Sequence, residues 1–147
     1  MSGLAALLAG HNPPGLYQWH SAAHVEDVQH AAEHAGWEFA YLDGWAVEDK
    51  DSFLAAVAKC LDFPDYFGAN FDAMADCLSD VNPAGKHGVL LLWDGWSPLA
   101  RHDQAAFAMA QSVLRDRIGD QRACTFAVVL RGEGPALDLP ELPVRHD

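Results

Sequence analysis

Three aspartates follow one another at four-residue intervals near the middle of the chain. At about 100° per residue on a helix, Asp72, Asp76 and Asp80 lie along one face. No lysine or arginine stands beside them at helical spacing within residues 71–80. Like charges four residues apart destabilise an isolated helix by about 0.2–0.5 kcal/mol per pair. The pattern therefore favours a cation that arrives from another molecule.

The residues around this row of carboxylates suit contact with a protein. Tyr66 and Phe67, in the preceding loop, supply aromatic surface beside the charges. Gly68 permits a close backbone approach or a positive φ. Asn70 is a good N-cap for the helix, and Ser79 lies beside the acidic row. We predict a protein-binding surface here.

Two other interpretations of the carboxylates stay open at this point. A solvated acidic face with no partner needs nothing more than these residues. An acid–base enzyme site is the other, because paired carboxylates can share protons. Such an enzyme would be a small hydrolase that uses Asp72 or Asp76, together with a histidine. It also needs a pocket, which two carboxylates on an exposed helix face rarely form.

Histidine spacing raises a metal hypothesis. His20 and His24 are four residues apart, and so are His30 and His34. Such pairs can bind zinc on one helix face, but the HExxH motif is absent from the sequence. Surface histidines with incidental spacing explain the pattern more simply. We predict neither a metal site nor a cofactor.

Composition limits the class of partner. The 147 residues include 9 lysines and arginines against 21 aspartates and glutamates, a formal net charge of −12. Such a surface repels nucleic acids and anionic lipids and attracts cationic proteins. Three cysteines without a CxxC pair indicate reduced thiols, and the N-terminal apolar run lacks the basic region of a signal peptide. We therefore expect a cytoplasmic protein.

Apolar runs alternate with helical patterns, which predicts an α/β fold with a mostly parallel sheet. On the helix that carries the aspartates, Phe71, Met74, Ala75 and Leu78 share a predicted buried stripe. The predicted strands are residues 15–19, 37–42, 89–93 and 124–130. The predicted helices are residues 20–35, beginning near an N-cap at Ser21, then 49–61, 71–78 and 104–118, before an extended tail.

The run Pro64-Asp65-Tyr66-Phe67-Gly68-Ala69-Asn70-Phe71-Asp72-Ala73-Met74-Ala75-Asp76-Cys77-Leu78 resembles the segment that identifies the barstar family. These proteins are intracellular inhibitors of secreted microbial ribonucleases such as barnase. The resemblance implies a barstar-like α/β fold, a small parallel sheet packed against helices. It further implies an extra N-terminal strand–helix unit at residues 1–36, a barstar-like domain at 37–131 and an extended tail at 132–147.

In that family the helix and its preceding loop plug the nuclease active site. The resemblance implies that Asp76 takes the place of an RNA phosphate among the enzyme's arginines and histidines, with Asp72 as a second interface carboxylate. We thus expect a monomer that binds a basic ribonuclease one to one, without catalysis and without direct contact to nucleic acid or membrane. The predicted partner surface comprises Tyr66, Phe67, Gly68, Asn70, Asp72, Ala75, Asp76 and Ser79.

The sequence departs from the family pattern at two places. Ala75 replaces a tryptophan common in the family, and Asp80-Val81-Asn82 stands where an aromatic residue is usual. A further interface acid belongs on the later helix, where Asp116 and Asp120 are both candidates. An acidic immunity or adaptor module for another basic toxin is therefore an alternative, and the role of residues 1–36 stays open.

Overall fold

A five-stranded parallel sheet forms the centre of the computed structural model, which describes residues 2–64 and 67–144. The strands run in the order β2-β3-β4-β1-β5, and each hydrogen-bonded pair is parallel. Their bounds are β1 (Leu16–Trp19), β2 (Glu38–Asp43), β3 (Gly88–Asp94), β4 (Thr125–Arg131) and β5 (Glu141–Leu142). The expected α/β class with a small parallel sheet is confirmed.

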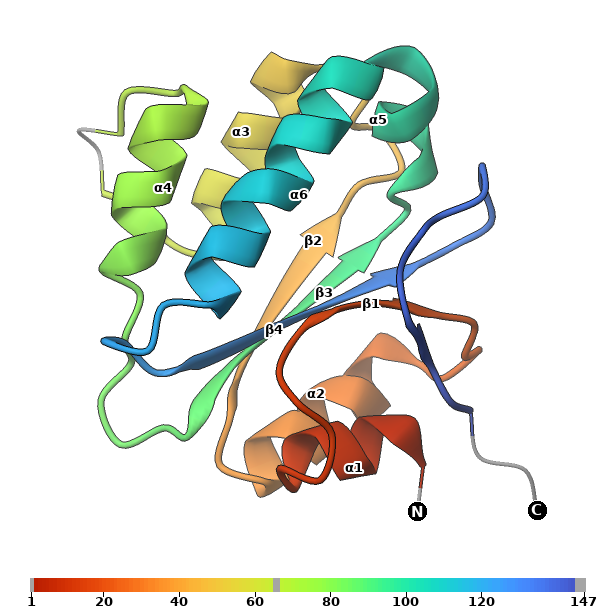
Figure 1. Ribbon diagram of the computed structural model, residues 1–147, viewed down its shortest axis with the longest axis vertical. Helices are drawn as coiled ribbons and strands as arrows, with labels where there is room; N and C mark the ends of the chain where they lie inside the picture. Colours follow the sequence, from red (N-terminus) through yellow and green to blue (C-terminus); the bar gives the residue numbers. More distant parts are fainter. Residues whose placement is uncertain (1, 65–66, 145–147) are drawn as a thin grey trace.

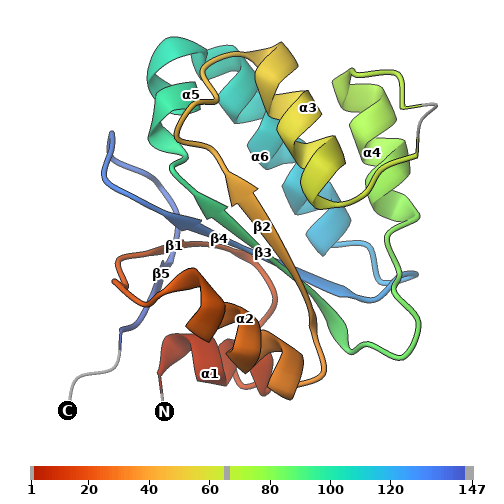
Figure 2. The same ribbon diagram turned by 180° about the vertical axis from the view of Figure 1, so that it is seen from behind.

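Helices cover both faces of the sheet (Figures 1 and 2). Two of them, α1 (Gly3–Leu8) and α2 (Val25–His34), lie on one face. The other face carries α3 (Lys50–Cys60), α4 (Phe71–Ser79), α5 (Ser97–His102) and α6 (Gln104–Ile118). None of the helices in the described residues is long and apolar enough to cross a membrane.

The β3 strand shows why both faces are apolar. All seven of its residues are buried, as expected for a central strand of a parallel sheet covered on both sides. Because side chains alternate between faces, Leu91 and Trp93 pack in the core beneath α3–α6, whereas Leu90 and Leu92 pack beneath α1 and α2. The run VLLLW therefore joins two hydrophobic cores.

The predicted element bounds hold within about one residue for most elements, but α2 begins at Val25 and not at His20. Its N-cap is His24, and Ser21 instead accepts a hydrogen bond from the backbone N–H of Ala23 at 3.1 Å. Arg131 donates to the carbonyls of Ser21 at 3.4 Å and Ala23 at 2.6 Å. A distant side chain therefore holds this segment outside the helix.

Three short elements were not predicted from the sequence: α1, α5 and β5. The β5 strand lies in the tail, where it pairs with Gln18 and Trp19 of β1. The tail also reaches α1, because the backbone N–H of Gly3 donates to the carbonyl of Pro143 at 2.9 Å. Residues of α1 and of β5 thus contribute to one hydrophobic core.

Candidate protein-binding site

The α4 helix begins at a side-chain cap. Asn70 has an extended backbone, and its Oδ1 accepts the N–H of Ala73 at 2.7 Å. This bond satisfies one of the free N–H groups of the first turn. Asp72 lies in that turn, where the helix dipole stabilises a negative charge. Asn70 therefore acts as the predicted N-cap.

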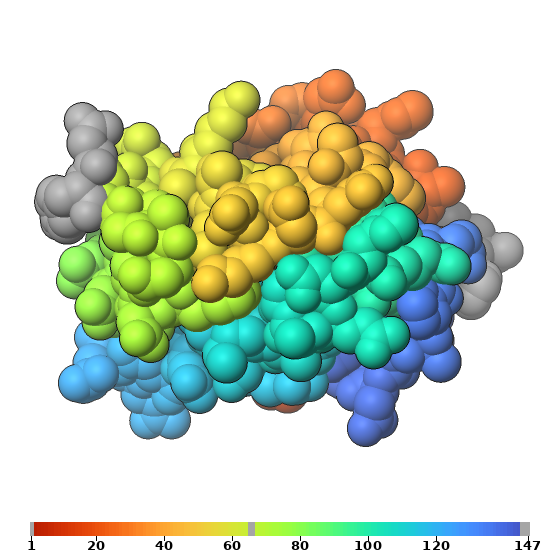
Figure 3. Space-filling view, turned by 90° about the horizontal axis from the view of Figure 1, so that it is seen from above, coloured from red at the N-terminus to blue at the C-terminus, as the bar shows by residue number. Residues whose placement is uncertain are grey.

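Packing sets which side of α4 faces outward. Met74 and Leu78 are fully buried, and Phe71 is half-buried with its ring 6.2 Å from that of Phe53. Ala75 is exposed, so its predicted place on the buried stripe was wrong. The physical reason is that α4 lies at the edge of its layer beside α6 (Figures 1 and 3), and Ala75 borders an open space between the two helices.

Asp72, Asp76 and Asp80, hereafter the acidic face, are all exposed on the outer side of α4. The ion pairs of the described residues join His20 to Glu141, Asp120 to Arg122 and Asp94 to Arg131, and none involves the acidic face. Asp80 is the C-cap residue of α4, where the helix dipole disfavours an anion. These three carboxylates therefore face solvent without a charged partner from the described chain.

The carboxyl end of α4 is held by a buried arginine that sequence analysis missed. Arg117, only 3% exposed, donates to the carbonyls of Leu78 at 2.9 Å, Val81 at 2.8 Å and Cys124 at 3.0 Å. Its guanidinium also lies 4.9 Å from the ring centroid of Phe126. The available signal was its position on α6, seven residues after the buried Ala110 on the apolar stripe.

Of the predicted contacts in the loop before α4, Phe67 and Gly68 lie within the described residues. Phe67 is half-buried and packs 5.2 Å from the ring of Phe63, and Tyr66 lies outside the described residues. The positive φ occurs at Ala69, at 50°, rather than at Gly68. A Cβ on Gly68 would meet only Asn70 and Ala73, at 3.5 and 3.6 Å, which are ordinary contact distances. No described intrachain contact requires glycine there.

A cavity of about 310 Å³, hereafter the notch, lies between α4 and α6 next to the acidic face. Ser79, whose hydroxyl donates to the carbonyl of Asp76 at 2.7 Å, lies on its α4 side with Ala75. The small side chain of Ala75 leaves this space open. The lining residues are Ala75, Ser79, Val113, Asp116, Arg117, Asp120 and Arg122.

Asp116 and Asp120, the two candidate interface acids on or after the later helix, both line the notch but differ in their hydrogen bonds. Asp120 accepts hydrogen bonds from both the side chain of Arg122 at 3.1 Å and its backbone N–H at 3.0 Å. The side-chain bond from Arg122 is the main reason that the pKa of Asp120 lies below its usual range. Asp116 is exposed and forms no ion pair with the described residues. Asp116 is therefore the better candidate for an intermolecular contact.

Only one of the two histidine pairs lies on a helix. His20 and His24 precede α2, so they do not lie one turn apart on a helix, whereas His30 and His34 both belong to α2. Within residues 2–64 and 67–144, no group of three histidine, cysteine or acidic side chains is arranged to hold a metal. The three cysteines are free thiols.

A second charged cluster lies at the carboxyl ends of β3 and β4. Arg131 binds both carboxylate oxygens of Asp94 at 3.0 Å, and the Tyr41 hydroxyl donates to Asp94 at 3.0 Å. Burial alone would raise the pKa of Asp94, but the bonds from Arg131 and Tyr41 and the charge of Arg131 hold it below its usual value. Burial, then the hydrogen bond to Asp94, raises the pKa of Tyr41 to about 12.

This cluster fills the position where open α/β sheets commonly bind ligands. The chain leaves β1 toward α2 on one face and leaves β2 and β3 toward the other face (Figures 1 and 2), so the connections change direction beside β1. The guanidinium of Arg131 stacks there 5.6 Å from the ring of Trp19. The loop after β1, residues 20–24, contains no glycine.

Comparison with solved structures shows the breadth of this architecture. The fold is similar to that of the Aeropyrum pernix ORC2 protein, solved in ADPNP and ADP complexes, with a TM-score of 0.60 and 13% sequence identity. The match covers 89% of this chain and 39% of that protein. At such low identity the likeness concerns the fold alone.

Sequence comparison is more specific about ancestry. No curated protein sequence matches this chain significantly. The family model described as Barstar (barnase inhibitor) matches residues 37–131, the region from the start of β2 to the end of β4 that includes α4 and its capping loop. This match spans well over half of the chain. The protein therefore belongs to the barstar family.

Proposed function

We propose that this protein inhibits a basic, barnase-like ribonuclease by presenting the carboxylates of Asp76 and Asp72 to the cationic groups that bind RNA phosphate. The observation that carries the proposal is the acidic face, which is exposed and free of ion pairs with the described chain. Membership of a family named for barnase inhibition supports the same partner class. The protein then acts by binding and needs neither a cofactor nor catalysis.

The physical basis is the strength of charge-assisted hydrogen bonds in a desolvated interface. A carboxylate that faces guanidinium donors forms short, often bidentate bonds. These bonds gain strength where a nuclease cleft excludes water. The net charge of −12 draws a basic protein toward the surface and speeds encounter at low salt. Such an inhibitor would bind one to one and would protect the cell that produces the nuclease.

Other residues surround these carboxylates in the proposed interface. Phe67 and Gly68 lie before α4, and Ser79 and Asp116 border the notch. Asn70 acts indirectly, because its cap fixes the first turn and thereby orients Asp72. Arg117 does the same at the other end of the helix through three backbone carbonyls. Rigid placement of this kind lowers the ordering cost of binding.

A titration of the protein against a panel of basic guanyl-preferring ribonucleases tests the proposal. We expect one-to-one inhibition of at least one member, and we expect Asp76→Ala to weaken binding by about 2–5 kcal/mol, because the facing cations lose their partner. Glu133→Ala, an exposed acid in a distant loop, serves as the matched control for charge. Absence of inhibition across the panel, or equal potency of the Asp76→Ala variant, contradicts the proposal.

The notch supports a second candidate partner, a different basic toxin. Ala75 leaves a space beside the acidic face that a bulkier residue would fill. The surface there accepts a protruding side chain from a partner of different shape. Affinity capture from cells that produce the protein distinguishes the two candidates. If the parent but not the Asp76→Ala variant recovers a basic toxin without nuclease activity, that toxin replaces the ribonuclease as the target.

A further inference from the structure

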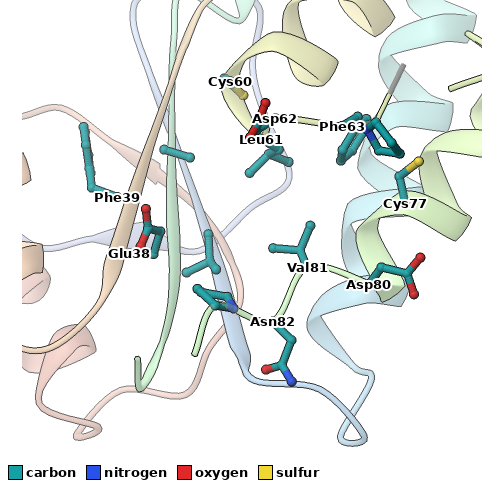
Figure 4. Close-up of a pocket in the computed structure, with 14 residues that line it drawn as sticks. Glu38, Phe39, Cys60, Leu61, Asp62, Phe63, Cys77, Asp80, Val81 and Asn82 are labelled. Atoms are coloured by element: carbon teal, nitrogen blue, oxygen red, sulfur yellow. The ribbon is translucent and has the colours of Figure 1, made fainter. Parts of the chain in front are cut away.

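A second hollow adjoins the carboxyl end of α4 (Figure 4), and it shares no lining residue with the notch. Its volume is about 440 Å³, and it opens between the start of β2, the segment after α3 and the carboxyl end of α4. Leu61, Phe63, Val81 and Val89 supply apolar surface inside it. We call this space, together with the neighbouring edge of β2, the β2 groove.

Among the described residues that line the β2 groove, every charged one is acidic. Glu38, Asp62 and Asp80 come from three different segments, are exposed, and form no ion pair with the described residues. Burial raises the pKa of the adjoining Cys60 thiol to about 12, so this thiol adds no charge at neutral pH. An apolar space surrounded by carboxylates matches a lysine or arginine side chain, whose aliphatic stem is apolar and whose end is cationic.

The edge of β2 offers backbone hydrogen bonds beside this space. In the part of the chain that the structure describes, β2 is the outermost strand of the sheet and pairs with β3 alone. Within the described residues, no other backbone or side-chain hydrogen bond reaches the main chain of residues 38–43. A free strand edge of this kind is a template for an additional strand.

Strand geometry links the edge to the hollow. Ala40 and Leu42 belong to the core beneath α3–α6, whereas Phe39 and Tyr41 pack on the α2 side. Glu38 is two residues before Ala40, so it shares the face that holds the hollow. A strand added to β2 therefore directs every second side chain over the hollow and the others toward Phe39.

We propose that the β2 groove binds an extended polypeptide segment in which basic and apolar residues alternate. The segment pairs with the free edge of β2, and a lysine or arginine side chain inserts between Glu38, Asp62 and Asp80. Its apolar side chains lie on the other face, beside Phe39. The β2 groove shares Asp80 with the acidic face but includes neither Asp72 nor Asp76, the two carboxylates of the proposed nuclease contact, so peptide binding here does not depend on that function.

A heptapeptide of alternating valine and lysine, acetylated and amidated at its ends, is a suitable probe for calorimetry and NMR with the full chain. We expect binding, together with slower hydrogen exchange at the β2 amides that point away from β3. Combined substitution by Glu38→Gln, Asp62→Asn and Asp80→Asn should weaken binding about tenfold, because three partly screened charge contacts are lost. The corresponding peptide of valine and glutamate should not bind.

Two control variants separate the β2 groove from general attraction to an acidic protein. The combination Glu26→Gln, Asp51→Asn and Glu133→Gln removes the same charge from exposed sites elsewhere and should bind the peptide as the parent does. The combination Asp72→Asn and Asp76→Asn should also retain binding, although it should abolish nuclease inhibition. Equal loss of peptide binding in either control, or unchanged exchange of the β2 amides, overturns the proposal.

Discussion

The acidic face of α4 and the charged cluster at the carboxyl end of the sheet differ in whether their carboxylates are paired within the chain. Asp94 is 8% exposed and receives two bonds from Arg131 and one from Tyr41. Asp72 and Asp76 are exposed and have no charged partner among the described residues. One region satisfies its carboxylate within the chain, and the other leaves its carboxylates to solvent.

The difference shows which charges serve the fold. Arg131 joins Asp94 to the carbonyls of Ser21 and Ala23, and it therefore fastens the segment before α2 to strands β3 and β4. Removing this ion pair should lower the free energy of unfolding. The carboxylates of α4 form no ion pair with the described residues, and their mutual repulsion costs stability. Charges that lower the stability of the free protein are most simply explained by a partner.

The largest effect on stability is expected from Arg131→Met. This change leaves Asp94 buried without its cation and leaves two carbonyls without a donor. We expect the free energy of unfolding to fall by about 3 kcal/mol, measured by urea denaturation at pH 7. Adding Asp94→Leu should recover much of the loss, since the unpaired buried charge is then absent. A single variant as stable as the parent would mean that the ion pair does not fasten the fold.

The same variant has a predicted pH dependence. In the parent, the pKa of Asp94 is below its unfolded value of about 3.9. The stability that this group contributes is therefore complete above that value and is lost as the pH falls through the folded pKa. Without Arg131, burial of Asp94 favours its protonated form. The stability gap between parent and Arg131→Met should thus be widest at neutral pH and should narrow below about pH 4. A gap independent of pH would contradict this.

An intermediate effect is expected on binding from Ala75→Trp, which fills the notch. Ala75 is exposed, so the fold should keep its stability within about 0.5 kcal/mol. If the target inserts a side chain here, inhibition of the cognate nuclease should weaken by about 1–3 kcal/mol, as overpacking does in protein interiors. Ala75→Ser, which keeps the space open, is the control. Unchanged inhibition constants for both variants would exclude the notch from the interface.

The smallest effect is expected from Asp80→Asn, which acts on the free protein. Asp80 ends α4 and lies four residues after Asp76. Neutralising it relieves repulsion and an unfavourable dipole interaction, so we expect the free energy of unfolding to rise by about 0.3–1 kcal/mol. Thermal unfolding of the parent and variant at low salt measures this change. A loss of stability would show that Asp80 has a compensating contact inside the chain.

Local signals were sufficient for much of the site. The helical spacing of the aspartates and the capping asparagine determined α4 and its acidic row, because both depend on residues within one or two turns. The burial of Ala75 was predicted wrongly because it depends on a contact that is distant in sequence. Which neighbouring helix covers a given side of α4 depends on the placement of α6, some thirty residues later in the sequence.

The chain's composition and short-range patterns thus determined its class, most of its helices and strands, and the row of carboxylates on α4. The tertiary structure alone decided that Arg117 holds the end of α4 and that Arg131 delays the start of α2. It also decided that, among the described residues, Asp120 has an ion-pair partner whereas Asp116 has none. These outcomes depend on contacts between residues far apart in sequence, and the bonding partner of a charge follows from distance in space rather than from spacing along the chain.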